Sequence, residues 1–156
     1  MTLVQLVRSD LAAWGRVWNS GPSARYLFHY CGMRATFLYR VSHFLWQKRV
    51  PLLPGFLFRL NITLHGFDVP PTVDIGPGLY VPHPVGTVIS ADKIGANVTL
   101  ISSITIGMRG VGEFPTLEDG VFVGAGVPFL SQKAPRGHVF LPSRAWRKYR
   151  PPLCMS

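Results

Sequence analysis

Residues 67–107 read FDVPPTVDIGPGLYVPHPVGTVISADKIGANVTLISSITIG and contain the repeat that decides the fold. Aliphatic residues recur here, and for two further repeats beyond, in three runs whose members are six residues apart. They are Val69, Ile75, Val81, Ile94, Leu100, Ile106, Leu117 and Val123. A second aliphatic series follows four residues later, at Val73, Leu79, Val85, Val98, Ile104, Val121 and Val127. A fixed internal period indicates stacked units, each of which buries its apolar face only against its neighbours.

A period of six residues is typical of a coil with three flat faces. Each face is a short strand that points one aliphatic side chain into a narrow prism, and a turn that favours Gly, Asn or Asp follows it. Glycine follows the aliphatic residue in Ile75-Gly76, Ile94-Gly95, Ile106-Gly107 and Val123-Gly124. Stacked coils pair their backbones at about 4.8 Å per rung. Residues 67–126 are therefore predicted to form a parallel β-helix of about three coils, and an ordinary β-sandwich with chance spacing is disfavoured.

Two breaks interrupt the period. Val81 and Ile94 are thirteen residues apart, one more than two repeats, which predicts a small bulge near Ser90–Lys93. Ile106 and Leu117 are eleven apart, so the stretch Met108–Thr116 is predicted to leave the prism as a loop. Loops that protrude from a repeat scaffold often carry function.

The flanking segments lack this period. In residues 1–66, apolar residues at helical spacing predict helices over about Thr2–Trp18, Arg34–Trp46 and Gly55–Leu64. Residues 127–156 are predicted to be a basic, proline-rich, irregular tail. The expected organisation is α+β: an N-terminal helical segment (1–66), the β-helix (67–126) and the tail (127–156).

The charge is divided between the same three segments. The 156-residue chain has a net charge of +9, made up of +7 in residues 1–66, −4 in 67–126 and +6 in 127–156. The basic helices with interleaved aromatic residues suggest peripheral membrane contact, whereas the acidic repeat and the lack of a recognition motif oppose nucleic-acid binding. Two cysteines, Cys31 and Cys154, make no disulfide framework, and Asp10 interrupts any secretory signal, so a cytoplasmic location is expected.

The candidate chemistry centres on one histidine. The chain has no G-x-S-x-G, P-loop, C-x-x-C or H-E-x-x-H motif. His83 lies in the repeat, in VPHPVG, where it should face outward near a corner, and Asp68 precedes it by fifteen residues, about one coil. A carboxylate on one imidazole nitrogen would leave the other free as a general base for a hydroxyl. Spacing alone equally allows a turn aspartate and a surface histidine.

The other histidines have plainer interpretations. His29 and His43 fall in the helical segment, where packing or surface roles are expected. His65 is placed at a helix end, where a cationic side chain suits the helix dipole. His138 falls in the tail and is assigned no role.

The repeat resembles the first coils of the serine acetyltransferase family, among the left-handed β-helix, hexapeptide-repeat acyltransferases. That family has a segment close to V-D-I-H-P, then D-H-A-T-G, then a repeat that ends in V-T-L-G. The corresponding residues here are FDVPP (67–71), PHPVG (82–86) and ITIG (104–107). The resemblance spans about residues 64–126, and its Asp and His lie at the family's separation.

The resemblance implies transfer of an acetyl group from acetyl-CoA, a co-substrate, directly to an acceptor hydroxyl, with no metal. His83 would be the general base and Asp68 its orienting carboxylate. Acetyl-CoA would lie between prisms of a homotrimer, beside backbone that corresponds to Gly107 and Ala125.

Several positions depart from the family pattern. Pro82 replaces the Asp before the catalytic His, and Glu113-Phe114 replace an Arg-His pair that holds the serine carboxylate. These changes favour a different or wider acceptor, such as a sugar hydroxyl of a polysaccharide or its lipid-linked precursor. Family members also continue with further coils where this chain has residues 127–156. A shifted reading frame, leaving a truncated homologue that acts only as a trimeric scaffold, is a further hypothesis.

Overall fold

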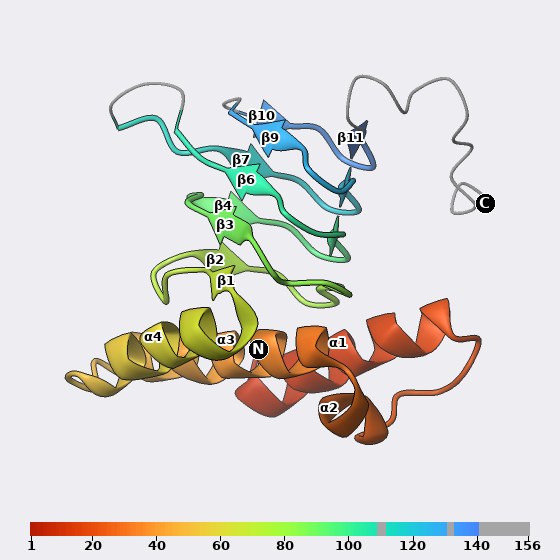
Figure 1. The fold of residues 1–156 in the computed structure, drawn as a ribbon, viewed down its shortest axis with the longest axis vertical. Helices are drawn as coiled ribbons and strands as arrows, with labels where there is room; N and C mark the ends of the chain where they lie inside the picture. Colours follow the sequence, from red (N-terminus) through yellow and green to blue (C-terminus); the bar gives the residue numbers. More distant parts are fainter. Residues whose placement is uncertain (109–111, 131–132, 141–156) are drawn as a thin grey trace.

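The computed structural model describes residues 1–108, 112–130 and 133–140, and it consists of a helical layer with a β-helix stacked on it (Figure 1). The helices are α1 (Leu3–Val17), α2 (Arg25–His29), α3 (Cys31–Gln47) and α4 (Leu53–His65). The strands of the first two coils are β1 (Phe67–Asp68), β2 (Asp74–Ile75), β3 (Thr87–Ile89), β4 (Lys93–Ile94) and β5 (Thr99–Leu100). Those of the next two are β6 (Thr105–Ile106), β7 (Thr116–Leu117), β8 (Phe122–Val123), β9 (Pro128–Phe129), β10 (Lys133–Ala134) and β11 (Val139–Phe140).

All strand pairs are parallel and form the three walls of a prism. The first wall has the order β1-β3-β6-β9, the second β2-β4-β7-β10, and the third β5-β8-β11, which a bridge from Tyr80 to Thr99 extends by one rung. The Tyr80 bridge stands in for the third-wall strand of the first coil, and from β3 onward consecutive strands fall on successive walls, so the chain completes a coil every three strands. The structure thus confirms the three-sided β-helix.

The interior of the prism is aliphatic. The eight residues of the first predicted series are all buried, each with no more than 2% of its surface exposed. In the second series six of the seven are buried, and the exception is Val85. Each wall of a coil is a strand of only two or three residues. A polar side chain at an inward position would therefore lie among aliphatic side chains without a hydrogen-bond partner.

The repeat continues further than predicted. Strands β9, β10 and β11 add a fourth coil over residues 128–140, so the expectation of an irregular tail from residue 127 is wrong for this stretch. The inward residues of this coil are Phe129, Ala134 and Phe140, two of which are aromatic, and the Phe129–Ala134 step is one residue short. A search for aliphatic residues at steps of six therefore misses it. Residues 141–156 lie outside the described residues.

The predicted bulge near Ser90–Lys93 is also wrong. The step from Ile89 to Ile94 is five residues, one fewer than the period, whereas the step from Val81 to Ile89 is eight. Val81, Ile89 and Ile94 are all fully buried, so all three side chains point into the prism. The two extra residues therefore lie in the corner between Val81 and Thr87. The second break is where it was predicted, since the chain between β6 and β7 makes a long excursion, of which residues 109–111 lie outside the described part.

The three predicted helices are present as α1, α3 and α4, and α2 was not predicted. Thr2 and Gln5 form a reciprocal capping box at the start of α1, and Gly66 ends α4 with φ of 62°. No helix within the described residues has both the length and the apolar character needed to cross a bilayer.

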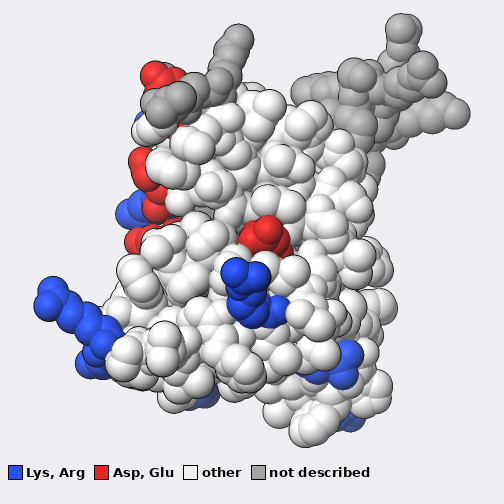
Figure 2. Space-filling model, turned by 60° about the vertical axis from the view of Figure 1, so that its left-hand side comes forward, with Lys and Arg blue, Asp and Glu red and all other residues white. Residues whose placement is uncertain are grey.

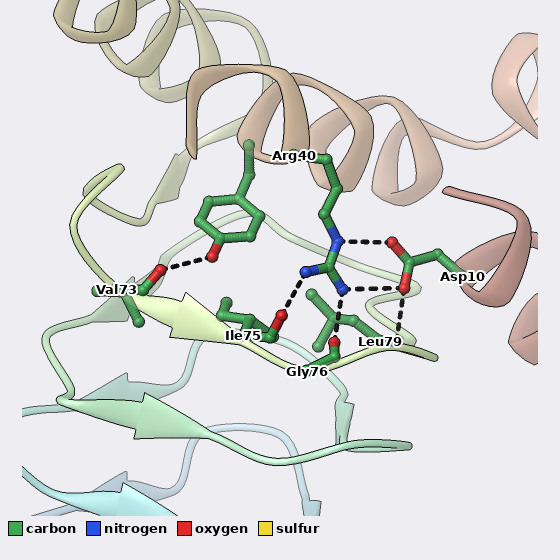
Figure 3. Close-up of polar contacts among 7 residues, drawn as sticks. Asp10, Arg40, Val73, Ile75, Gly76 and Leu79 are labelled. Carbon is green, nitrogen blue, oxygen red and sulfur yellow. Dashed lines mark hydrogen bonds and ion pairs between the residues drawn. The ribbon is translucent and has the colours of Figure 1, made fainter. Parts of the chain in front are cut away.

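A buried ion pair joins the helices to the first coil (Figure 3). The Arg40 guanidinium of α3 donates two hydrogen bonds to the Asp10 carboxylate of α1, at 2.8 and 3.0 Å. It also donates to the carbonyl oxygens of Ile75 and Gly76, and Asp10 accepts a hydrogen bond of 2.8 Å from the Leu79 amide. Both charged side chains are fully buried. Burial raises the pKa of the Asp10 carboxyl, and Arg40 and the Leu79 amide oppose that shift.

Two more side chains of α3 bind backbone carbonyls of the same coil. The Tyr39 hydroxyl donates to the Val73 oxygen at 2.6 Å, and the His43 Nδ1 lies 2.8 Å from the Pro71 oxygen. Burial raises the pKa of Tyr39, so its hydroxyl keeps the proton that it donates. The first coil has no coil beneath it, and α3 takes that place.

Replacement of Arg40 by Met should lower the free energy of unfolding by about 3–5 kcal/mol, because it leaves Asp10 buried and unpaired. Urea denaturation monitored by circular dichroism measures this. Lys133→Gln, which removes a partner of Glu118 from an exposed ion pair, should leave the midpoint unchanged. Equal effects of the two substitutions would contradict the capping role of Arg40.

Candidate active site

His83 lies in the widened corner that leads into the wall formed by β1, β3, β6 and β9. Backbone hydrogen bonds hold this corner on three sides. The His83 amide donates to the Ile101 oxygen of the coil above at 3.2 Å, and the Gly86 amide donates to the Gly66 oxygen below at 3.0 Å. The Thr87 amide closes a turn onto the Pro84 oxygen at 3.0 Å. The His83 side chain is exposed, as predicted, so its imidazole is open to solvent or substrate.

The two extra residues also reverse the predicted orientation of Val85. Val85 is 63% exposed, and Thr87 takes the interior position that Val85 was expected to fill. The Thr87 hydroxyl is buried and has no hydrogen-bond partner among the described residues. The signal in the sequence was the cluster of two prolines and a glycine in PHPVG, which is typical of a wider turn.

Asp68 lies in β1, one rung below this corner. It stands between the buried residues Phe67 and Val69, so by strand alternation its half-buried side chain lies on the outer side of the wall. Asp68 is paired with Val88, five residues after His83. Neither residue points into the prism. No hydrogen bond or ion pair joins Asp68 to His83 within residues 1–108, and their pairing stays a prediction.

The residues predicted to lie beside acetyl-CoA border the same wall, Gly107 one coil and Ala125 two coils above the His83 corner. Gly107 follows β6, and its amide donates to the Phe129 oxygen at 3.1 Å. Ala125 is exposed in the turn from β8 to β9, at the opposite edge of the wall. All four predicted site residues are thus associated with one wall of the prism, and the role of Gly107 and Ala125 stays a prediction.

Two glycines of the helical segment allow the His83 corner to pack closely on the helices. A Cβ atom at Gly32 of α3 would overlap the Val81 carbonyl oxygen. A Cβ at Gly66, the left-handed residue that ends α4, would lie 3.2 Å from the Val85 Cα atom. Sequence analysis gave no role to either glycine, because the contact joins segments far apart in the chain.

The remaining histidines have structural or surface positions. His43 is buried between Pro71 and the Gln47 side chain, and His29 and His138 are exposed. Burial lowers the pKa of His65, and the Arg34 guanidinium lowers it further. Burial therefore works against a cationic His65 at the end of α4.

The loop after β6 carries the predicted departures from the family. Glu113 and Phe114 are both exposed, and so is Met108, which precedes residues 109–111. Pro82 is half-buried beside His83. Within the described ranges, no three His, Cys, Asp or Glu side chains gather as metal ligands.

Comparison with known proteins agrees with this fold. No protein-family model matches the chain. A serine acetyltransferase from Helicobacter pylori is 35% identical over 125 residues, which are 74% of this chain and 72% of that protein. One from Synechococcus elongatus is 34% identical over 122 residues, 73% of this chain and 50% of the relative.

Solved structures give the same result. The Neisseria gonorrhoeae serine acetyltransferase superposes with a TM-score of 0.77 at 24% identity. The matched region is 88% of this chain and 55% of the Neisseria chain. Soybean serine acetyltransferase complexed with serine has a TM-score of 0.72 at 28% identity, over 91% of this chain and 65% of its own. This likeness and the three parallel walls define a left-handed β-helix of hexapeptide repeats.

Within that class, the chain belongs to the serine acetyltransferase family. It spans 50% and 58% of the length of the relatives from Synechococcus elongatus and Mycobacterium tuberculosis.

Substitution of Gly32 by Ala should destabilise the protein by about 1–3 kcal/mol, because the added methyl group forces α3 away from the Val81–Pro82 backbone. Gly55→Ala in α4 is a matched control, since a Cβ there meets no atom within 4 Å. It should stabilise α4 by about 0.5–1 kcal/mol through helix propensity. Thermal unfolding of both variants tests this, and a stabilising Gly32→Ala would refute the close contact.

Proposed function

We propose that the protein is an O-acetyltransferase that transfers an acetyl group from acetyl-CoA to an acceptor hydroxyl. The observation that carries the proposal is the location of His83. This exposed imidazole lies on a corner held by backbone hydrogen bonds, and a carboxylate lies on the adjoining strand one rung below. Membership of the serine acetyltransferase family supports the same chemistry.

In this proposal His83 is the general base. One ring nitrogen accepts the hydroxyl proton as the acceptor oxygen attacks the thioester carbonyl carbon. The tetrahedral intermediate then collapses, the carbon–sulfur bond breaks, and the imidazolium returns its proton to the departing CoA thiolate. The products are an O-acetyl ester and CoA, with no acyl-enzyme and no metal in the sequence of steps.

Asp68 is a positioning residue in this mechanism. Its carboxylate would bind the second ring nitrogen of His83, fix the tautomer and stabilise the imidazolium that forms. The two side chains are not hydrogen-bonded in the free chain, and catalytic hydrogen bonds often tighten only when substrate binds. Backbone amides would stabilise the developing oxyanion.

Acetyl-CoA is proposed to bind along the same wall, beside the backbone at Gly107 and Ala125. In the proposed homotrimer this binding site would be a groove between neighbouring prisms. The exposed position of Ala125 at one edge of the wall would leave it accessible to a ligand in that groove. A cytoplasmic location fits this intracellular co-substrate.

The acceptor is proposed to be a hydroxyl compound without the charges of free serine. Pro82 offers no carboxylate to an amino group, and Glu113 would repel the carboxylate of serine rather than hold it. These two residues favour a sugar hydroxyl over serine as the acceptor. A trimeric scaffold without activity is the remaining alternative.

His83→Ala should reduce kcat for acceptor-dependent release of CoA by about 10²–10⁴-fold, the usual contribution of a general base. Asp68→Asn should give a smaller loss, chiefly in kcat, since it leaves the base in place. Thiol release from acetyl-CoA, followed with a colorimetric thiol reagent, measures both. His29→Ala is the control, because it removes an exposed histidine from the helical segment. A scaffold would show no difference between His83→Ala and the unchanged chain.

The acceptor preference can be measured separately. With acetyl-CoA saturating, kcat/KM for simple glycosides should exceed that for L-serine by about tenfold or more, because a site that lacks partners for charged groups rejects them on desolvation. Reactions without acceptor correct for hydrolysis. A preference for serine would overturn the sugar assignment and leave the acetyltransferase intact.

A further inference from the structure

An apolar surface remains uncovered on the outer side of the helical layer. It is formed by the turn between α3 and α4 and by one side of α4, and is called here the α4 surface. Its members and exposed fractions are Trp46 at 51%, Leu52 at 91%, Leu53 at 43%, Phe56 at 61% and Leu64 at 62%. Contiguous exposed apolar side chains of this size mark interaction sites in soluble domains.

The positions on α4 follow helical geometry. Leu53, Phe56, Leu60 and Leu64 recur at steps of three and four and therefore share one side of the helix. Buried residues of the same helix, Pro54, Asn61 and His65, face the rest of the molecule. Helix α4 is thus apolar on its outer side as well as packed on its inner side.

Leu52 is held in a costly conformation at the tip of this surface. Its φ of 63° and ψ of −43° form a positive-φ conformation that leucine rarely adopts, and its side chain is almost wholly exposed. Exposure brings no packing energy to offset the strain. Next to it, between the end of α3 and the start of α4, lies an open hollow of about 730 Å³. It is lined by Trp46, Gln47, Arg49, Val50, Pro51, Leu52, Pro54 and Gly55.

The surroundings of the α4 surface are basic. Lys48, Arg49 and Arg59 are exposed beside it, and the chain has no Asp or Glu from residue 11 to residue 67. Figure 2 shows Lys and Arg but no acidic side chains at the helical end of the face in view, and acidic side chains on the β-helix above it, along one edge and in the middle of the face. An apolar strip flanked by cations complements an anionic lipid surface.

We propose that the α4 surface docks peripherally on an anionic lipid bilayer, with Leu52 and Phe56 inserted at the acyl boundary and Lys48, Arg49 and Arg59 at the headgroups. A second copy that met this surface with its own α4 surface fits less well, because a two-fold contact would bring the acid-free surface against itself and oppose like charges. The proposal does not depend on the acetyltransferase activity.

The test uses sedimentation of the full chain with vesicles of phosphatidylcholine, alone or with 30% phosphatidylglycerol. The chain should bind the anionic vesicles and bind the neutral ones far more weakly. Leu52→Asn combined with Phe56→Gln should weaken binding about tenfold or more. Circular dichroism checks that this variant keeps the fold of the unchanged chain. Lys48→Gln with Arg59→Gln should weaken binding about 25-fold, about fivefold for each charge.

Matched controls remove equivalent groups elsewhere. Phe28→Gln with Val4→Gln removes two exposed apolar side chains from α2 and α1, which are 78% and 67% exposed. Arg8→Gln with Arg25→Gln removes two exposed charges. Both controls should bind within about threefold of the unchanged chain. Binding that falls equally in the controls, or a chain that ignores anionic vesicles, would overturn the proposal. Light scattering without lipid gives a further check. A lower molecular mass for the Leu52→Asn, Phe56→Gln variant than for the unchanged chain would also overturn the proposal, because the α4 surface would then join copies of the chain.

Discussion

The open lower end of a parallel β-helix is the constraint on which the rest of this structure depends. Every coil satisfies its backbone by pairing with the coils above and below, and the first coil has none below it. Arg40 and Asp10 supply the missing partners from two helices, and bind the Ile75 and Gly76 carbonyls and the Leu79 amide. A buried ion pair is tolerated here because each of its polar atoms has a partner.

The helices and the first coil together position the candidate active site. Strand β1 lies directly above α4, and its pairing with β3 sets Asp68 one rung below the corner that holds His83. The corner itself rests on glycines of the helical segment and is hydrogen-bonded to the coil above. The helices therefore position the site without contributing a predicted catalytic side chain to it.

The helical segment has two sides with different roles. Its inner side carries the buried polar groups that complete the first coil, and its outer side carries exposed apolar and basic groups along α4. The acidic residues of the chain are concentrated in the β-helix. This separation would allow the molecule to meet a negatively charged surface with one end and leave the wall that bears His83 accessible.

The sequence by itself determined the prism, because most inward positions are aliphatic and because a fixed period converts spacing into position. It also brought His83 and Asp68 forward as candidates, but spacing alone equally allowed a turn aspartate and a surface histidine, and their pairing stays a prediction. Tertiary structure decided what a count in steps of six cannot show: the fourth coil, whose inward residues include Phe129 and Ala134, and the outward turn of Val85. It also decided the ion pair between Asp10 and Arg40, which are thirty residues apart. This pair forms only when α1 and α3 pack against the first coil, because Arg40 also binds carbonyl oxygens of that coil.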